Sequence, residues 1–340
     1  MLRTMAQQLK VQWVVGGLIA AAAMSLWPVA AGAQTKLLIA HTGTPGNSVY
    51  VVFDEFAKRV QKYSNGTIKP EVHHSGELGG DDQLLQSLKL GTVDLASAAT
   101  GNMGSMTKSL LWADLPYIFS SRDTMEKVFS NRDITKHLAA DIERDIGTKV
   151  LGYVQVGGFR MLENRRRALK TPADVKGLKF RTTASPLDVG LIQAWGGLPS
   201  QVAWAETFTA VQQGVVDGLN LQPVWTALNG FGQVIKYATR NNAVMTLHCI
   251  QMSKKAWDRL TPEQRQAVEK AMEESIKVAN KADADDESKY VEKLNAGGMA
   301  IYDPTPAEMA EWRKSAKVVW DKFAPTMDQV MLKQVEAIQQ

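Results

Sequence analysis

The 340-residue sequence contains one cysteine, Cys249, and so cannot form a disulfide within the chain. It also carries little net charge, because 39 Lys and Arg residues face 35 Asp and Glu residues. This small excess gives no reason to expect binding to nucleic acid. After residue 33, no apolar run approaches the roughly 18 residues that a membrane-spanning helix needs. The composition is that of a globular protein long enough for two lobes.

Common motifs of enzyme active sites are missing as well. None of the five histidines stands in His-Glu-x-x-His spacing, and there is no Gly-x-Ser-x-Gly elbow, phosphate loop or dinucleotide fingerprint. His73 and His74 are adjacent in a strand-like stretch, so their side chains point to opposite faces and are poor candidates for sharing a metal ion. His248 and Cys249 fail as a thiolate and imidazole pair for the same reason, and we expect Cys249 to be buried and structural. These absences disfavour an enzyme without excluding one.

Residues 1–33 have the pattern of a secretory signal. Arg3 and Lys10 precede an apolar run from Val11 to Leu26, and Ala31–Ala33 supplies the small residues of a cleavage site. The alternative is an N-terminal membrane anchor, which the length of the run would allow. The small-residue site favours removal, with the mature chain starting at Gln34. We therefore expect export to the bacterial periplasm.

The rest of the chain alternates strand and helix patterns. Residues 36–40 and 68–72 read as strands, and apolar residues recur at helical spacing between them. A second helix is expected from about residue 81 to Gly91, where a left-handed C-terminal position suits glycine. Residues 93–97 then read as another buried strand. Strand, helix, strand is the repeating unit of a parallel α/β sheet.

One short pattern occurs twice. Leu88–Asp94 and Val211–Asp217 each combine a helix end, a glycine and the start of a buried strand. Two copies so far apart favour two similar lobes over one large sheet, although such junctions are common enough to recur by chance. The boundaries that we expect are 34–157 and 247–286 for lobe I, and 158–246 and 287–340 for lobe II.

Three helix starts share a capping threonine, a proline at the first helical position and an acceptor three residues after the threonine. These starts are at Thr171, Thr261 and Thr305. The second opens an apolar-faced pattern with no further glycine or proline until Gly297. About 33 residues at 1.5 Å each give a helix about 50 Å long. Such a helix is long enough to lie across both lobes and to act as a brace that bends when they close.

Two arginines near strand ends are candidates for binding an anion. Arg181 ends the apolar strand 178–181 and is followed by the hydroxyl groups of Thr182, Thr183 and Ser185, while Arg160 follows the apolar stretch 150–156. A planar guanidinium matches a carboxylate with two parallel hydrogen bonds, which lysine cannot provide. The alternative for each is a solvated surface arginine. The run 165–167 of three arginines is too short for a nucleic-acid patch, and we interpret it as a solvated turn.

Five segments are informative when they are taken together, in their order along the chain. Together they resemble the DctP family, the solute-binding proteins of tripartite ATP-independent periplasmic (TRAP) transporters, and the similarity extends from about Lys36 to beyond Trp312. The segments are Ser75–Asp81, Leu90–Asp94, Asp114–Phe119, Thr171–Arg181 and Trp204–Gly218.

The resemblance implies a two-lobed α/β periplasmic binding protein of type II-like fold, with a hinge and a long helix bracing both lobes. It implies a small organic acid as ligand and integral membrane TRAP transporter subunits as partners. It implies no enzymatic activity and no cofactor, and we expect a monomer. On the family pattern, Arg181 is the principal carboxylate-binding residue, Arg160 the second cation and Trp204 an aromatic pocket wall. Polar contacts to the ligand are expected from Thr42, Asp81, Asn102 and Asn220.

Departures from the pattern bear on the ligand. Relatives that bind sialic acid carry a glutamate and an arginine where this chain has Ala98–Asn102, and an asparagine at the position of Leu221. Fewer charged groups, together with Trp204, favour a smaller or more apolar carboxylate than a sugar acid. The segment Asp217–Asn220 lacks the Glu-Trp pair of some relatives that bind 2-oxo acids with sodium, so a bound metal is not implied.

Two alternatives to this reading stay open. An ABC-type or tripartite tricarboxylate binding protein would share the export signal and the two lobes, but should lack the Asp114–Phe119 and Trp204–Gly218 segments. A periplasmic enzyme acting on a carboxylic acid is the alternative from another class, and turnover of a bound acid would be its mark.

Overall fold

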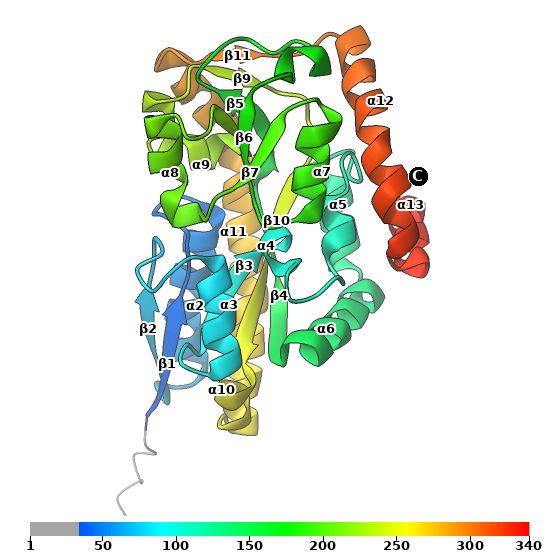
Figure 1. The fold of residues 1–340 in the computed structure, drawn as a ribbon. Coiled ribbons are helices and arrows are strands. Elements are labelled where there is room, and N and C mark those ends of the chain that lie inside the picture. The colour runs from blue at the N-terminus through cyan, green and yellow to red at the C-terminus, as the bar shows by residue number, and fades with distance from the viewer. Residues whose placement is uncertain (1–33, 340) are drawn as a thin grey trace, which may run out of the picture. The chain divides into compact units, whose positions relative to one another are not determined.

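The computed structural model describes residues 34–339, so the expected signal segment and its cleavage site lie outside the described residues. Two mixed β-sheets organise this part of the chain (Figure 1). The first has the strand order β2-β1-β3-β10-β4 and consists of β1 (Thr35–Ala40), β2 (Ile68–His73), β3 (Leu95–Ala99), β4 (Thr148–Phe159) and β10 (Met245–Ser253). The second has the order β11-β9-β5-β8-β6-β7 and consists of β5 (Met161–Asn164), β6 (Lys179–Thr182), β7 (Leu198–Gln201), β8 (Gly218–Leu221), β9 (Tyr237–Thr239) and β11 (Ala300–Tyr302).

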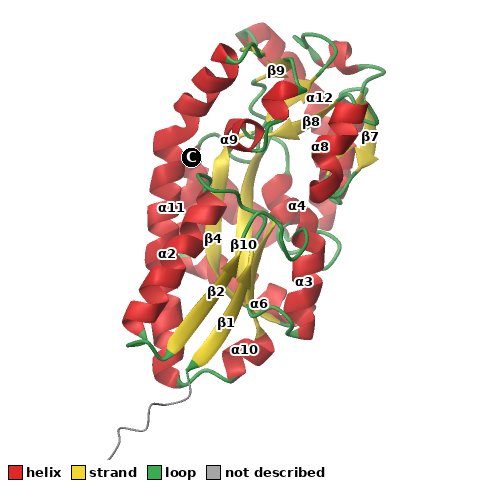
Figure 2. Ribbon diagram, turned by 90° about the vertical axis from the view of Figure 1, so that its left-hand side faces the viewer, coloured by secondary structure: helices red, strands yellow, loops and turns green. Residues whose placement is uncertain are grey.

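Helices surround both sheets, and none within residues 34–339 is long and apolar enough to cross a membrane. The α-helices are α2 (Ser48–Tyr63), α3 (Asp81–Leu90), α4 (Thr100–Met103), α5 (Arg122–Ser130), α6 (Arg132–Ile146), α7 (Pro186–Ala194), α8 (Trp204–Gln213), α9 (Pro223–Leu228), α10 (Lys254–Asp258), α11 (Pro262–Ala296), α12 (Pro306–Phe323) and α13 (Gln329–Gln339). Short 3-10 turns are η1 (Leu111–Asp114), η2 (Pro172–Val175), η3 (Phe231–Gln233) and η4 (Ala324–Thr326). Figure 2 shows α2 and α11 on one side of the first sheet and α3 on the other.

The two copies of the repeated sequence pattern lead into strands of different sheets. α3 ends at Gly91 (φ 75°) before β3, and α8 ends at Gly214 (φ 76°) before β8. Both glycines adopt the left-handed conformation that favours this residue at a helix end. In each copy, an aspartate carboxylate then accepts an N–H from a parallel strand: Asp94 from β1 at 2.8 Å, and Asp217 from β6 at 2.9 Å. The expectation of two similar α/β halves is confirmed.

Two short connections between strands join the sheets directly, and the helix α11, which leads from β10 to β11, joins them a third time. β4 of the first sheet leads into β5 of the second with Arg160 as the only residue between them, and the chain returns from β9 to β10. The two crossings are bonded to each other, because the N–H of Arg160 donates to the carbonyl of Val244 at 2.9 Å. This pairing fixes Arg160 at the boundary between the lobes.

The long helix is present as predicted. α11 has 35 residues, and Thr261 caps its start by accepting the N–H of Gln264. The helix contacts α2 and β4 beside the first sheet and α9 and β11 beside the second. It therefore braces both lobes.

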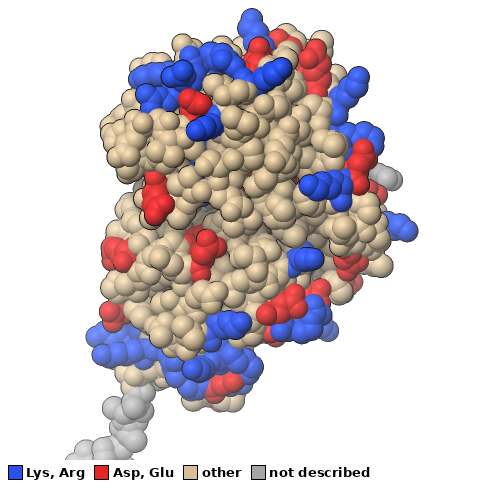
Figure 3. Space-filling model, viewed as in Figure 1, with Lys and Arg blue, Asp and Glu red and all other residues tan. Residues whose placement is uncertain are grey.

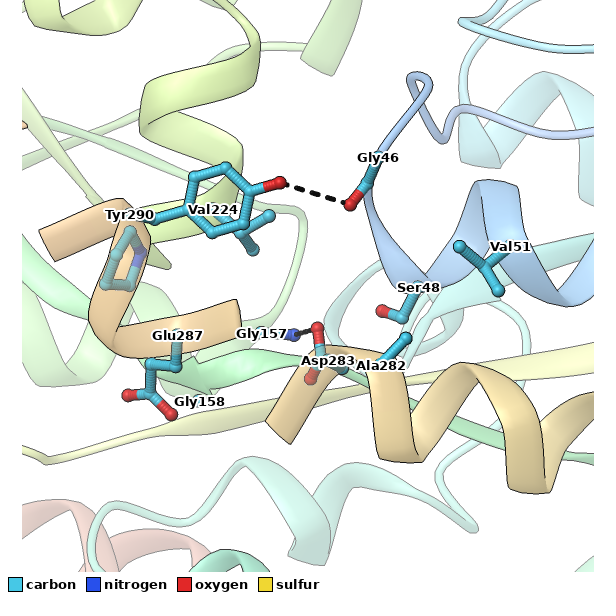
Figure 4. Close-up of a pocket in the computed structure, with 11 residues that line it drawn as sticks. Gly46, Ser48, Val51, Gly157, Gly158, Val224, Ala282, Asp283, Glu287 and Tyr290 are labelled. Atoms are coloured by element: carbon cyan, nitrogen blue, oxygen red, sulfur yellow. Dashed lines mark hydrogen bonds between the residues drawn. The ribbon is translucent and has the colours of Figure 1, made fainter. Parts of the chain in front are cut away.

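α11 is tied to the strand that crosses between the lobes. Figure 4 shows Asp283 accepting the N–H of Gly157 at 2.9 Å, and Tyr290 donating to the carbonyl of Gly46 at 3.3 Å. Arg122, which begins α5, adds ion pairs to Asp283 at 2.7 Å and to Glu287 at 2.9 Å. Burial raises the pKa of Asp283, although Arg122 opposes the shift. The middle of α11 and the crossing strand are therefore held together at the boundary between the lobes.

Three details differ from the expectations or qualify them. The start at Thr171 leads only to the turn η2, because Gly177 (φ 81°) redirects the chain into β6. The turn 165–167 is not simply solvated: the guanidinium of Arg165 donates to the carbonyl of Val211 at the end of α8. Helix α13 contacts α5, which lies next to the first sheet. The expected boundaries assign α13 to lobe II and α5 to lobe I, so the end of the chain contacts the lobe to which it was not assigned.

Close packing between β8 and β5 generates a stability prediction. A Cβ atom on Gly218 would overlap the carbonyl oxygen of Glu163 on β5, so strands of the second sheet would have to move. We expect Gly218→Ala to lower the free energy of unfolding by about 3 kcal/mol. Gly80→Ala, where a Cβ would meet nothing within 4 Å, should cost less than about 1 kcal/mol. Urea unfolding of both variants tests this, and equal losses would contradict it.

Candidate ligand-binding site

A small hollow of about 60 Å³ lies between the two sheets. All seven residues predicted from the sequence to bind a ligand line it, so the structure brings them together. The complete lining is Thr42, Asp81, Ala99, Asn102, Arg160, Arg181, Thr183, Trp204, Asn220, Leu221, Trp225 and His248.

The ends of strands and the starts of helices position these side chains. Thr42 follows β1, Arg181 lies near the end of β6, and Asn220 lies near the end of β8. Asp81 and Trp204 are the first residues of α3 and α8. In α/β sheets, the carboxyl ends of parallel strands are the usual place for a ligand, because loops and helix N-termini meet there.

Arg181 is a buried cation without a carboxylate partner. Its side chain is only 7% exposed, and its Nε–H donates to the carbonyl of Val202 at 3.0 Å. Within residues 34–339, no carboxylate oxygen lies within 4.0 Å of the guanidinium nitrogens, so both Nη groups lack a partner. Burial lowers the pKa of Arg181 to about 10, a shift that nearby aspartates oppose. The group is still charged at neutral pH and is suited to an anion.

Arg160, in contrast, has an ion-pair partner. Its Nη1 donates to both carboxylate oxygens of Asp188, at 3.0 and 3.2 Å, and its Nε donates to the hydroxyl of Thr246 at 2.7 Å. Asp188 also accepts the hydroxyl of Thr183 at 2.5 Å. Burial would raise the pKa of Asp188, but Arg160 and Thr183 outweigh it and hold this pKa below its ordinary value. Arg160 therefore supplies a fixed charge that is already balanced.

A hydrogen-bonded carboxylate forms the opposite wall, on the side of the first sheet. Asp81 is buried and accepts the hydroxyl of Thr42 at 3.0 Å through Oδ1. Its Oδ2 accepts the N–H of Ala99 and the side-chain amide of Asn102, both at 2.9 Å. These bonds hold three of the predicted residues in one network.

Aromatic rings close the hollow. Trp204 lies 5.9 Å from the guanidinium of Arg181 and meets Trp225 edge to face, with ring centroids 5.1 Å apart. Trp225 in turn stacks on His248 at 6.3 Å. The Nδ1 atom of His248 lies 3.1 Å from the hydroxyl of Ser97, and burial lowers the pKa of this histidine, although Asp81 opposes the shift. His248 is therefore a neutral polar group in an apolar wall.

A second buried carboxyl lies behind the site. Asp114 accepts the hydroxyl of Thr100 at 2.6 Å, and its Oδ2 is buried without a hydrogen-bond partner. Burial raises the pKa of Asp114 to about 7, although Arg160 opposes the shift. The group therefore titrates near neutral pH.

Sequence reasoning did not single out Trp225 and His248 as lining residues, or Asp188 as the partner of Arg160. All nine residues of β10 are buried, so no alternation of polar and apolar residues marks the side chain that faces the ligand. An acidic residue in the first turn of α7 was visible in the sequence. Its pairing with Arg160, which lies at the end of a distant strand, requires the tertiary fold.

A larger hollow, of about 900 Å³, opens between α6, β4 and α11. It contains none of the predicted binding residues. Two of its lysines already have ion-pair partners, since Lys149 lies 3.2 Å from Glu143 and Lys277 lies 2.7 Å from Glu273. The site between the sheets is the better candidate because it alone of the two contains the unpaired guanidinium of Arg181.

A metal-binding cluster is not assembled in the part of the chain that the structure describes. No group of three or more His, Cys, Asp or Glu side chains there is arranged to hold a metal ion. Cys249 is buried, as predicted, and burial raises the pKa of its thiol, which makes it a poor nucleophile. The site is suited to binding an anion.

Comparison with known proteins agrees with this geometry. The family model for bacterial extracellular solute-binding proteins, family 7 (DctP), matches residues 39–326. The chain belongs to this family. The resemblance inferred from the five sequence segments is confirmed, and the family is one of transport proteins that bind solutes.

Individual DctP-family relatives cover nearly the whole chain. The C4-dicarboxylate-binding periplasmic protein DctP of Rhodobacter capsulatus is 29% identical over 92% of this chain and 93% of its own. A TRAP periplasmic solute-binding protein of Sulfurospirillum deleyianum with bound succinate is 26% identical, with a TM-score of 0.85 over 90% of this chain and 99% of that chain. One from a Polaromonas species, bound to D-erythronate, is 26% identical, with a TM-score of 0.83 over 90% and 98%. The predicted two-lobed α/β fold is confirmed.

The pair of Arg160 and Asp188 is expected to be essential for stability in this DctP-family protein. Asp188→Ala would leave the buried Arg160 without an anion, and breaking a buried ion pair costs about 3–5 kcal/mol. Asp54→Ala removes an exposed pair with Lys58 on α2 and should cost less than about 1 kcal/mol. Urea unfolding measures both losses. A loss below 1 kcal/mol for Asp188→Ala would show that Arg160 does not depend on this carboxylate.

Asp114 predicts a pH dependence of stability. Its pKa is about 7 in the folded protein against an ordinary value of 3.8, so between these values the folded state binds the proton more tightly than the unfolded state. The contribution of Asp114 to the free energy of unfolding is complete below its pKa in the unfolded protein. It is lost as the pH rises through its pKa in the folded protein. We expect Asp114→Asn to flatten the dependence of Tm on pH between about pH 4 and pH 8. Parallel pH profiles for the wild type and the variant would argue against the raised pKa.

Proposed function

We propose that this protein is a periplasmic receptor that captures a small organic acid between its lobes and delivers it to integral membrane subunits of a TRAP transporter. One observation carries the chemical class: the guanidinium of Arg181 is buried and charged, and both its Nη groups lack a partner within the described chain. The carboxylates in the names of the relatives support the same class.

In this proposal the carboxylate of the ligand binds the two Nη groups of Arg181 with parallel hydrogen bonds. A planar fork satisfies both the charge and the geometry of a desolvated carboxylate. Arg160 adds a positive field from a position fixed by Asp188, and Trp204 covers an apolar part of the ligand. The polar contacts come from Thr42, Asp81, Asn102 and Asn220.

Closure couples binding to recognition by the transporter. Arg181 belongs to the second sheet, while Asp81 follows the first, so a ligand that contacts both favours the closed arrangement of the lobes. We place the lobes at 34–157 with 247–286 and at 158–246 with 287–340. The crossing from β4 to β5 near residue 158 supports this division, and the contact of α13 with α5 qualifies it at the C-terminal end.

Export and assembly complete the proposal. The family's description as extracellular supports an exported protein, and we place the cleavage of residues 1–33 after Ala33. The receptor acts as a monomer and does not transform its ligand.

The mature protein, residues 34–340, should be stabilised by organic acids in a thermal-shift screen. The screen compares mono- and dicarboxylates, 2-oxo acids, aromatic acids and sugar acids with amines and neutral sugars. A ligand at 100 times its Kd adds about 2.7 kcal/mol, which raises Tm by several degrees. Stabilisation by amines or neutral sugars alone would overturn the proposed class.

The same acid should lose measurable binding in Arg181→Ala, while the Tm of the ligand-free protein changes by only a few degrees. Arg181→Lys should also bind poorly, because it keeps the charge but loses the planar fork. Arg144→Ala is the matched control, since Arg144 is 67% exposed on α6. Tight binding by Arg181→Ala in isothermal titration calorimetry would remove Arg181 from the site.

A further inference from the structure

We propose that the ligand of this site has a single carboxylate, and that the rest of the molecule presents hydrogen-bond donors, as hydroxyl or ammonium groups, in place of a second carboxylate. This inference rests on the proposed function, because it takes Arg181 as the carboxylate anchor. A solved relative holds succinate, so the fold itself admits a dicarboxylate. The side chains that line the site in this protein, and not the fold, limit the ligand to one carboxylate.

The supply of positive charge limits the ligand to one carboxylate. Among the described lining residues, Arg160 and Arg181 are the only arginines or lysines. Arg160 is bound to both oxygens of Asp188 and to the hydroxyl of Thr246. Arg181 is the one of the two without an ion-pair partner within the described chain, and one guanidinium fork matches one carboxylate.

Negative charge already exceeds positive charge around the site. Asp188 is paired with Arg160, Asp81 lies in the lining, and Asp82 is the next residue of α3, so three carboxylates stand near two guanidinium groups before any ligand binds. On the face shown in Figure 3, acidic side chains border the notch between the lobes, and Lys and Arg side chains lie toward the top, the bottom and the right-hand side of the molecule. A second ligand carboxylate would enter a field that is already negative, in a space from which closure removes water.

The wall that faces Arg181 is built to meet donors. A ligand anchored on the second sheet presents its other end to Asp81, Thr42 and His248 of the first-sheet side. Asp81 is a carboxylate that can only accept hydrogen bonds, so a second carboxylate beside it would be repelled and could donate nothing. A neutral His248, whose pKa burial lowers, does not supply the missing positive charge.

An unpartnered acceptor in the lining calls for the same chemistry. The Oδ1 atom of Asn220 is buried and has no hydrogen-bond partner within the described chain. A buried acceptor without a donor destabilises the complex. A hydroxyl or ammonium group can donate to Asn220, whereas a carboxylate cannot.

Matched acids test the inference in isothermal titration calorimetry on the exported protein after removal of any bound ligand. D-erythronate and meso-tartrate differ only in a terminal hydroxymethyl group against a carboxylate. Succinate, 4-hydroxybutyrate and 4-aminobutyrate share a four-carbon skeleton and place a carboxylate, a hydroxyl or an ammonium at the far end. We expect erythronate to bind at least tenfold more tightly than tartrate, and 4-hydroxybutyrate or 4-aminobutyrate at least tenfold more tightly than succinate. Whichever of 4-hydroxybutyrate and 4-aminobutyrate binds more tightly shows whether the site prefers a hydroxyl or an ammonium donor.

Each other outcome has a defined meaning. Tartrate or succinate binding as tightly as its monocarboxylate partner would overturn the inference and leave the proposed function standing. Binding by none of the five acids would also overturn it, and the wider acid screen would then decide separately whether the proposed function fails.

Variants locate the source of the discrimination. Asp81→Asn removes the negative charge of the first-sheet wall and should reduce the preference for erythronate over tartrate at least fivefold. The control Asp54→Asn, on the surface of α2, should leave the preference unchanged. If Asp81→Asn does not fold, Asn220→Ala provides the second test: it should weaken erythronate binding at least fivefold and change tartrate binding less. An unchanged preference in the folded Asp81→Asn protein, or equal losses for both acids in Asn220→Ala, would contradict the proposed wall chemistry.

Discussion

A charged guanidinium removed from water requires an anion, and Arg181 has no ion-pair partner within the described chain. Its neighbours fix it in position without neutralising it: the carbonyl of Val202 accepts the Nε–H, and the guanidinium lies over the ring of Trp204. The hollow between the lobes therefore contains one guanidinium charge without an ion-pair partner. In the proposed complex, a carboxylate of the ligand pairs with this charge, which gives binding both its affinity and its orientation.

Arg160 and Asp81, the other charged groups of the lining, are held by partners within the described chain. Asp188 neutralises Arg160, and the backbone and side chains around Asp81 satisfy most of its oxygens. Asp81 begins α3 beside the first sheet, whereas Arg181 lies near the end of β6 in the second sheet, so the proposed closure would change their separation. The ties between α11 and the crossing strand, through Asp283 and Gly157, place the pivot close to the same residues. Binding and closure are thus parts of one arrangement.

Much of this arrangement could be predicted from the sequence, and the limits have physical reasons. Helix caps, left-handed glycines and the repeated pattern ending at Asp94 and Asp217 depend on local chemistry, so the elements and the two halves were predictable. Arg160 and Arg181 were candidates from their positions near strand ends, and the other five site residues came from the family resemblance. All seven line one hollow. The partnership of Arg160 with Asp188 and the place of His248 in the wall depend on contacts between distant segments. Local patterns carry no information about such contacts, least of all in a fully buried strand such as β10.

A crystal structure of the protein with its tightest-binding organic acid would test the central claim most directly. The account predicts that both oxygens of one ligand carboxylate lie within hydrogen-bond distance of Nη1 and Nη2 of Arg181, with Arg160 still bound to Asp188. A ligand that places a neutral group against Arg181, or an acid bound in another cavity, would contradict the account.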